Sequence, residues 1–362
     1  MTDQSTSHRG TRLFIIAASF VIIIWGISQA QAVVVVLLVS MFLAVIGRVP
    51  VLWMERKRIP TVIAVLIVVT AMITLLLSIG AVVGASLNNF SDALPFYQTR
   101  IHNMIGTLKA MLAGKGIVVT DKILLGYVNP GAVMNLTAGL FTALGSVLSN
   151  IFLILFTVLF ILLEASSFPA KLRLVHDNPK ASFLTFTKFV DDIKRYVIIK
   201  TFINLAAATL ITIWLSILGV DFPFLWGSLE FLLLFIPSVG SIVAAVPAVL
   251  LALIQLGGGS AAFTAAGYLA IGTILGNVVE PKIMGRKFGM STLVVFLSLI
   301  FWGNLLGLVG ALLCVPLTMT LKLACEESED TQWIAILLGP EISPDGNPRA
   351  SKRGKYWLHR KS

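Results

Sequence analysis

Long apolar runs separated by short polar segments set the pattern of this 362-residue chain. Three runs, at residues 59–84, 139–163 and 261–279, are clearly long enough for a membrane-spanning helix, which needs about 20 mainly apolar residues. A fourth run, 201–219, directly follows a basic segment that ends at Lys200. With the shorter runs included, the pattern predicts an all-α polytopic membrane protein with about 6–8 transmembrane helices.

Two shorter apolar runs near the amino terminus, residues 13–27 and 32–47, are joined by the polar segment 28–31. Basic residues lie at both outer ends of the pair. An excess of Lys and Arg marks the cytoplasmic side of membrane segments. We therefore expect a helical hairpin whose two ends face the cytoplasm.

Two other stretches, around residues 101–112 and 181–200, have apolar residues on one helical face and charged or polar residues on the other. The number of preceding spans places the first stretch on the outer side of the membrane. We expect the second to lie along the cytoplasmic membrane surface, as amphipathic helices commonly do.

Two apolar segments in the second half of the chain are interrupted. The segment 221–256 contains residues 237–241, which include Pro and Gly, and the segment 288–321 contains Trp302-Gly303-Asn304. Pro removes a helical hydrogen bond and Gly permits a turn. Paired interruptions of this kind indicate the binding site of a secondary transporter.

The broken segments either cross the membrane or re-enter it. If each crossed once, the basic loop 280–287 would lie outside the cell, against the positive-inside bias. Two re-entrant hairpins, the first entering from outside and the second from inside, keep this loop and the basic tail in the cytoplasm. We prefer the re-entrant arrangement. Lipid cannot form hydrogen bonds with the backbone N–H and C=O groups that a hairpin tip exposes, so the two tips must line a cavity within the protein.

These segments divide the chain into consecutive parts. They are a cytoplasmic amino terminus (1–12), N-terminal membrane helices (13–84), an extracytoplasmic amphipathic region (85–137), a transmembrane helix (138–163), a cytoplasmic amphipathic linker (164–200), a C-terminal transport region with broken helices (201–323) and a cytoplasmic basic tail (324–362).

Composition supports a membrane protein that is not an enzyme. The chain is 57% hydrophobic and 12% charged, against about 45–50% and about 25% in soluble domains. Its net charge of +10 comes from residues that flank the apolar runs, so we expect no nucleic-acid partner. Two cysteines, Cys314 and Cys325, form neither a disulfide framework nor a metal-binding spacing. Phosphate-binding and hydrolase motifs are absent from the sequence, so we expect no ATP hydrolysis, no metal and no cofactor.

Polar residues inside the apolar segments are the candidates for function, because an ionisable group at the bilayer centre costs at least about 2.5–3.5 kcal/mol. Glu230 is a candidate proton or cation site, or else a residue at the outer interface. Asn277 and Glu280 share a helix face, although Glu280 also suits local pairing with Lys282. The substrate or ion pathway that we expect comprises Asn204, Glu230, Pro237, Ser238, Gly240, Ser241, Asn277, Glu280, Pro281, Lys282, Gly303 and Asn304.

Several stretches of the second half resemble the autoinducer-2 exporter family of bacterial membrane proteins. They are Asn-Val-Val-Glu-Pro-Lys-Ile-Met-Gly-Arg at 277–286, and residues 291–303, 307–310, 315–318, 224–227 and 236–241. The resemblance continues more weakly to the amino terminus. It implies export of autoinducer-2, a small polyhydroxylated signal, across the bacterial inner membrane. The family also includes members proposed as sodium/proton antiporters.

The chain departs from the family pattern at Glu230, where we expect a small or apolar residue, at Leu234, where relatives often carry Asn, and at Asn304, where they often carry Trp. Our first hypothesis is a secondary exporter of a small polar signal such as autoinducer-2, working by alternating access. The alternatives are a Na+(Li+)/H+ antiporter and a membrane scaffold that transports nothing. We expect a multi-pass homo-oligomer in the bacterial inner membrane, with both termini in the cytoplasm and the lipid bilayer, the signal molecule or a monovalent cation or proton as partners.

Overall fold

A computed structural model describes residues 21–113, 150–165, 179–237, 239–284, 290–327 and 331–339, with a few single positions besides, and it contains no β-strand in these ranges. The chain there forms α2 (Gln31–Arg56), α3 (Thr61–Ala113), α6 (Ile151–Glu164), α8 (Pro179–Leu218), α9 (Pro223–Leu233), α10 (Gly240–Leu256), α11 (Gly258–Gly272), a π-helix (Thr273–Val279), α12 (Glu280–Met284), α13 (Thr292–Glu327) and α14 (Gln332–Leu337). The all-α fold expected from the apolar pattern is confirmed.

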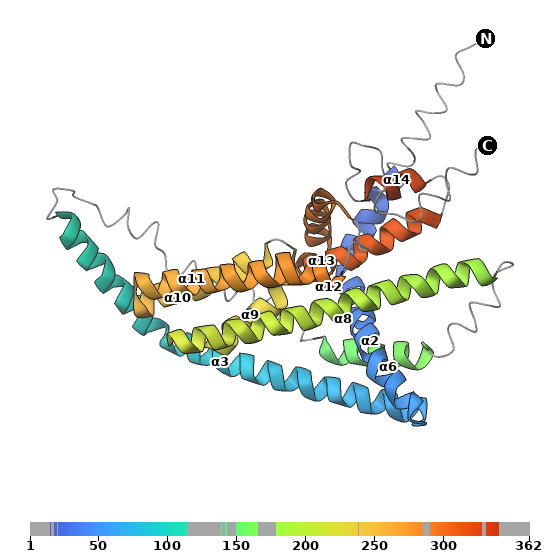
Figure 1. Ribbon diagram of the computed structural model, residues 1–362, viewed down its shortest axis with the longest axis horizontal. Coiled ribbons are helices and arrows are strands. Elements are labelled where there is room, and N and C mark those ends of the chain that lie inside the picture. Colours follow the sequence, from blue (N-terminus) through green and yellow to red (C-terminus); the bar gives the residue numbers. More distant parts are fainter. Residues whose placement is uncertain are drawn as a thin grey trace, which may run out of the picture.

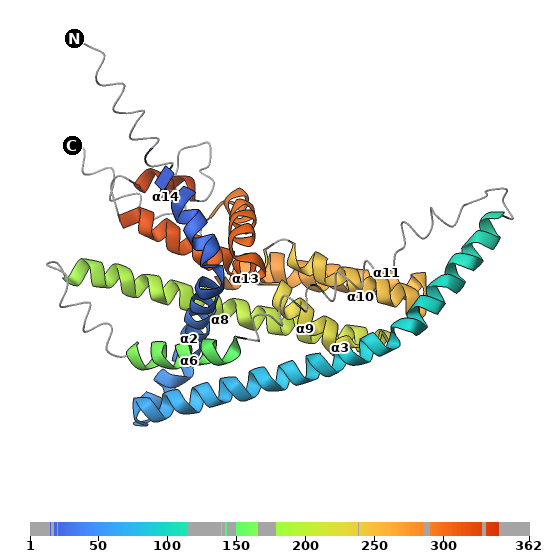
Figure 2. The same cartoon turned by 180° about the vertical axis from the view of Figure 1, so that it is seen from behind.

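The long helices α3 and α8 run along the molecule, and the carboxyl-terminal part of α3 projects as an arm beyond the other helices (Figures 1 and 2). Three apolar cores hold the described helices together. One joins α2, α3 and α6. A second joins the carboxyl-terminal part of α3 with α8, α9, α10 and α11. A third core, which contains Tyr196 of α8 and Cys314 of α13, packs against Phe42 of α2, so it links the first helices to the hairpin-bearing helices.

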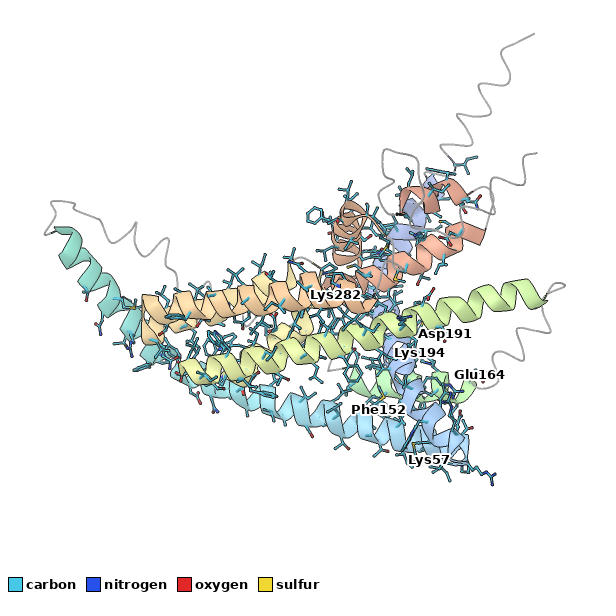
Figure 3. All side chains as sticks on the ribbon, viewed as in Figure 1. Lys57, Phe152, Glu164, Asp191, Lys194 and Lys282 are labelled. Atoms are coloured by element: carbon cyan, nitrogen blue, oxygen red, sulfur yellow. The ribbon has the colours of Figure 1, made fainter. Side chains whose placement is uncertain are left out.

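Apolar side chains also cover much of the outer surface. Phe152, Phe202 and Ile217 are 78%, 68% and 73% exposed, and a water-soluble monomer does not present so much apolar surface. In Figure 3 the charged residues Lys57 and Asp191 lie toward one end of the bundle, beyond Phe152. The segments long and apolar enough to cross a bilayer are Gln31–Arg56, Thr61–Ala93, Asp191–Leu218 and Gly258–Ile283, and Thr292–Glu326 has this length when its two arms are counted together. The chain is a multi-pass membrane protein.

The expected amino-terminal hairpin is wrong in the part that the structure describes. Residues 21–29 are helical, and Ala30 bends the chain into α2 without reversing it. The Ala30 amide donates to Gly26, and the Val34 amide donates to Ala30, so the helical ladder continues on both sides of the bend. The polar segment 28–31 has neither Gly nor Pro, the residues that favour a tight reversal.

The amphipathic segment 181–200 is also not a separate surface helix. It continues into the apolar run 201–219 as α8, a single helix of 40 residues. Likewise, the apolar run 59–84 continues into the polar segment that follows it as α3, a helix of 53 residues. No Gly or Pro stands at the junction in α8, and the single Gly84 at the junction in α3 is tolerated, so both helices propagate through.

The first broken segment is an antiparallel hairpin formed by α9 and α10. Pro223 occupies the first turn of α9, where its missing N–H costs nothing. Residues 234–237 and 239 lie in the turn, and a Cβ at Gly240 would collide with the Leu233 carbonyl. Only glycine permits that approach. At the open end, the Gln255 side chain accepts from the Asp221 amide (2.9 Å) and donates to the Gly219 carbonyl (3.0 Å).

The second broken segment is a hairpin within α13, but its turn lies at Gly307 and not at the expected Trp302-Gly303-Asn304. Gly307 has φ 66° and ψ −148°, outside the helical region and accessible mainly to glycine. The Trp302 indole N–H donates to the Thr318 hydroxyl at 3.0 Å, although a straight helix would separate these residues by about 24 Å. The two arms therefore run back along each other.

A hydrogen bond links the carboxyl-terminal part of α3 to the connection between α8 and α9, where the first hairpin begins. The Tyr97 hydroxyl donates to the Asp221 carboxylate at 2.6 Å. Asp221 lies in the short connection between α8 and α9, and its carbonyl accepts from the Trp226 indole at 3.0 Å. Burial, and then the hydrogen bond and charge of Asp221, raise the pKa of the Tyr97 phenol. The phenol therefore remains protonated, and the bond intact, until the pH rises through that elevated pKa.

Replacing Tyr97 by Phe removes this bond and is expected to lower the free energy of unfolding by about 1.5–3 kcal/mol, the usual contribution of a hydrogen bond to a charged group. The measurement is thermal unfolding of the purified protein in detergent. Thr99→Ala is the matched control, because the Thr99 hydroxyl is exposed and bonds only to the Pro95 carbonyl one turn earlier. Equal unfolding temperatures for Tyr97→Phe and the wild type would contradict the fastening role.

Candidate functional site

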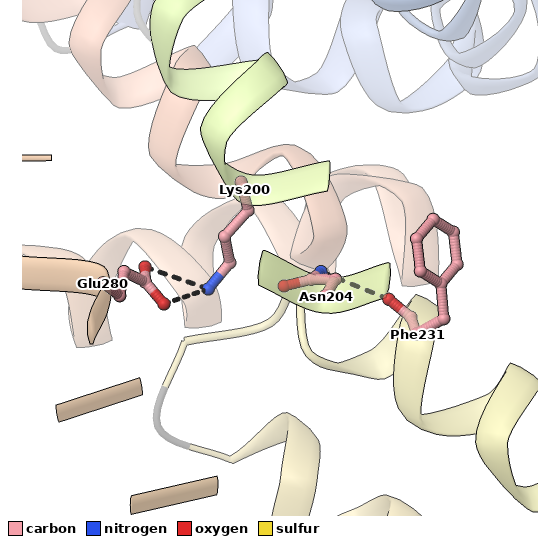
Figure 4. A network of polar contacts seen from close by, with 4 residues as sticks. All are labelled: Lys200, Asn204, Phe231 and Glu280. Carbon is pink, nitrogen blue, oxygen red and sulfur yellow. Dashed lines mark hydrogen bonds and ion pairs between the residues drawn. The ribbon is translucent and has the colours of Figure 1, made fainter. Parts of the chain in front are cut away.

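One face of α8 carries two polar side chains into the interior. Lys200 and Asn204 are one helical turn apart, and they are 5% and 0% exposed. The Lys200 ammonium lies 2.8 Å and 3.0 Å from the two carboxylate oxygens of Glu280. The Asn204 side-chain amide donates to the Phe231 carbonyl at 3.2 Å. Figure 4 shows both contacts, which connect α8 with α12 and with α9.

The partner of Glu280 differs from the sequence-based expectation. Local pairing with Lys282 is not formed, since Lys282 is exposed and Glu280 pairs with Lys200, 80 residues earlier in the chain. Sequence reasoning treated Lys200 only as the basic flank of an apolar run. The sequence did contain a clue to its position. If one helix continues through Lys200, this lysine lies on the same helix face as Asn204, four residues later.

Glu230 lies at the centre of this region. Its side chain is fully buried, and neither carboxylate oxygen has a hydrogen-bond partner among the described residues. The Lys200 charge and the Ser241 hydroxyl act on Glu230, and Glu230 in turn acts on Tyr268 of α11. Ser241 lies at the start of α10, where it packs against Gly272.

We refer to Lys200, Asn204, Glu230, Ser241, Tyr268 and Glu280 as the polar cluster. Within the described part of the chain, the buried side-chain atoms that lack a partner are all oxygens: Thr201 Oγ1, Asn204 Oδ1, Glu230 Oε1 and Oε2, Thr264 Oγ1 and the Tyr268 hydroxyl. An unsatisfied buried polar group costs about 1–3 kcal/mol, so such groups usually serve a bound molecule or ion. Three of these residues belong to the polar cluster, which therefore suits a small ligand rich in hydroxyl groups, water or a proton.

Both hairpins reach this region. Phe235, at the tip of the first hairpin, packs edge to face against Phe42 of α2, with ring centroids 6.0 Å apart. Phe42 also packs, as Trp302 does, against the core that includes Cys314 of α13. Leu308, beside the turn of the second hairpin, contacts the core formed by α9 and α10. The first tip therefore lies against α2, and the second hairpin contacts the core of α8 to α11; convergence of the two tips stays a prediction.

The other predicted pathway residues divide by position. Pro237 and Gly240 belong to the first hairpin tip, Pro237 half-buried and Gly240 buried, and Gly303 is half-buried in α13. Ser238 lies outside the described residues. The structure does not bring the remaining residues into the polar cluster, since their side chains are exposed: Asn277, Pro281, Lys282 and Asn304.

The π-helix at residues 273–279 sets the position of Glu280. In this wider helix the Glu280 amide donates to the Leu275 carbonyl, five residues back. Pro281 follows, which has no N–H and whose ring crowds the carbonyl four residues earlier in an α-helix. Short π-helical turns occur frequently at functional sites. This geometry replaces the regular helix face that was expected to unite Asn277 with Glu280.

Other places in the described chain suit a polar ligand less well. The groove between α3 and α6 is lined only by apolar side chains, among them Ile73, Phe152 and Phe156. Within the described ranges, no three His, Cys, Asp or Glu side chains gather in a way that would hold a metal ion. The polar cluster is therefore the candidate functional site.

Comparison with known proteins identifies the family of this chain. Residues 13–330 match the model of the AI-2E family transporters. The chain is 40% identical over 338 residues to the AI-2 transport protein TqsA of Escherichia coli, covering 93% of this chain and 98% of that protein. It is 32% identical to the putative transport protein YhhT of Escherichia coli, covering 98% and 100% of the two chains. A putative transport protein of Haemophilus influenzae is 33% identical over 89% of this chain and 94% of its own length. The chain belongs to the AI-2E family of transporters and is not an enzyme.

Proposed function

We propose that this protein is an inner-membrane secondary transporter that exports a small, polar, uncharged signal molecule, autoinducer-2. The observation that carries the proposal is the set of buried, unpartnered oxygens at the polar cluster. A polyhydroxylated molecule binds such a site through its hydroxyl groups, which both donate and accept hydrogen bonds. Its binding does not require a charged side chain. The 40% identity to the AI-2 transport protein TqsA supports the choice of substrate.

The proposed mechanism is alternating access, in which the hairpin-bearing helices move against the first helices. This division is supported by the separate cores of α2, α3 and α6 and of α8 to α11, while the third core, around Cys314, lies where the two groups of helices meet. Within the second unit, Asn204 satisfies the Phe231 carbonyl near the end of α9, so the backbone at the hairpin tip is stabilised without water. A substrate bound beside Asn204 and Glu230 then exchanges between the two sides as the hairpins move.

We further propose that both hairpins re-enter the membrane and that both termini are cytoplasmic. The first arm of α13, residues 292–306, is about 22 Å long and thus shorter than the roughly 30 Å hydrocarbon layer. α9, from Pro223 to Leu233, is shorter still. Assembly as a homo-oligomer stays a prediction, which cross-linking of the protein in native membranes tests.

Deleting the gene is expected to raise the autoinducer-2 retained inside the cells, and the wild-type gene is expected to restore export. Asn204→Ala is expected to reduce export at least tenfold, because the Phe231 carbonyl loses its donor and the cluster loses an oxygen. The matched control is Asn304→Ala, which alters an exposed amide of α13 and is expected to export normally. Unchanged retention after deletion, or equal effects of the two alanine variants, would count against the proposal.

A second function, exchange of Na+ for H+, is favoured by one observation, the fully buried carboxylate of Glu230. A lone buried carboxylate suits alternate binding of a proton and a small cation. Dye quenching in everted vesicles tests it by comparing Glu230→Gln with the wild type. Sodium-dependent dequenching by the wild type alone would favour the antiporter. If neither the wild type nor Glu230→Gln shows dequenching while the signal is exported, the antiporter function is excluded and the exporter function stands.

A further inference from the structure

The polar cluster contains two carboxylates and, among the described residues, a single cation. Lys200 pairs with Glu280, which leaves Glu230 without a counter-charge. Transfer of an isolated ionised carboxylate into an apolar interior costs so much that such groups are normally protonated or matched by a cation. In the arrangement seen here, with Lys200 on Glu280, burial therefore favours the neutral acid form of Glu230.

Lys200 is also placed to serve Glu230. Asn204, one turn after Lys200 on α8, bonds to the Phe231 carbonyl, which belongs to the residue next to Glu230. The Lys200 charge acts on Glu230 across this contact between α8 and α9. Lysine carries its ammonium on a flexible four-carbon stem, so the same side chain can turn from one carboxylate to the other.

We propose that Glu230 binds the proton that drives transport, and that Lys200 turns from Glu280 to Glu230 when that proton leaves. The inference rests on the proposed transport function and names its coupling ion. The O–H bond of the Glu230 carboxylic acid breaks, the proton passes to water, and the electron pair stays on the carboxylate. Lys200 keeps its charge throughout, and no oxidation or reduction takes place.

The neighbouring groups are suited to this exchange. Lys200 faces Glu230 from α8, Tyr268 faces it from α11, and Ser241 faces it from α10. The Tyr268 hydroxyl, which has no partner within the described residues, can donate to the carboxylate once the proton has left. On the other side of Lys200, Tyr196 and Cys314 face the ion pair with Glu280.

Infrared difference spectroscopy of the purified protein tests the proton site without any substrate. A step from low to high pH is expected to remove a carboxylic-acid C=O band from the wild type. Glu230→Gln is expected to lack this band from the outset. Glu280→Gln is expected to lack it at neutral pH as well, because Lys200 is then free to pair with an ionised Glu230. The matched control Glu326→Gln, at an exposed position of α13, is expected to keep it.

An acid band of wild-type size in Glu230→Gln would overturn the proposal, as would a band that Na+ removes at constant pH. The coupling is read from proteoliposomes as the ratio of autoinducer-2 uptake with a pH gradient to uptake without one. This ratio is expected to be well above one for the wild type and for Glu230→Asp, and to equal one for Glu230→Gln. A ratio in Glu230→Gln equal to that of the wild type also overturns it.

The two readouts separate this inference from the proposed function. If wild-type liposomes transport no autoinducer-2 while the Glu230 acid band is present and titrates, the choice of substrate fails and the proton site stands. If autoinducer-2 is transported but the Glu230-dependent band is missing, export stands and the proton site fails. When Glu230→Gln shows no uptake at all, the infrared comparison alone decides.

Discussion

Replacing Lys200 by Met is expected to abolish transport and to destabilise the protein by about 3–5 kcal/mol, the usual cost of removing one partner from a buried ion pair. Met keeps the length and apolar character of the stem but removes the charge, so Glu280 and Glu230 are left without the ammonium at the centre of the polar cluster. Thermal unfolding in detergent measures the destabilisation, and autoinducer-2 uptake by proteoliposomes measures transport.

The double variant Lys200→Met/Glu280→Gln distinguishes stability from function. Neutralising Glu280 removes the uncompensated charge, so the double variant is expected to recover most of the lost stability while transport stays absent. Lys282→Met is the matched control and is expected to behave like the wild type, because Lys282 is exposed. A wild-type unfolding temperature for Lys200→Met would show that the ion pair stabilises nothing.

Replacing Gly310 by Ala is expected to prevent the second hairpin from forming. A Cβ at Gly310 would collide with the backbone carbonyl of Trp302 and lie 2.7 Å from Leu306 Cβ. Overpacking alone costs about 1–3 kcal/mol, and here the obstructing carbonyl belongs to the opposite arm, so the arms must separate. The expected result is a drop in folded yield, measured by size-exclusion chromatography, with loss of uptake in whatever protein remains folded.

Gly303→Ala is the control in the same hairpin. Its added methyl group would meet only the Ala311 side chain, at 3.7 Å, which is ordinary van der Waals contact. Alanine also favours a helix by up to about 1 kcal/mol relative to glycine. This variant is expected to fold at least as well as the wild type. If Gly310→Ala folded equally well, the close approach of the two arms would be excluded.

The two hairpins show how far the sequence predicts local structure. The first was located correctly because Pro237 and Gly240 are both strong signals and lie together. The second was expected near Gly303, yet the turn lies at Gly307. Gly303, Gly307 and Gly310 are close in sequence, and sequence alone does not show which one turns the chain. The structure uses Gly307 for its positive φ and Gly310 for the contact between the arms.

The candidate site was predictable only in part. Glu230 and Asn204 were recognised because a polar group within a membrane segment is energetically costly and is therefore expected to have a function. The importance of Lys200 was missed because its partner, Glu280, is 80 residues away and a basic residue, Lys282, is much closer in sequence. Tyr268 was not considered either, since one hydroxyl in an apolar helix resembles an ordinary core residue until its lack of a partner is seen.

The most direct test of the central claim is the flux of labelled autoinducer-2 into liposomes that contain only the purified protein. The predicted result is saturable uptake by the wild type and by Asn304→Ala, with at least a tenfold lower rate for Asn204→Ala at equal amounts of folded protein. Wild-type liposomes that take up the label no faster than empty liposomes, with and without a pH gradient, would contradict the claim.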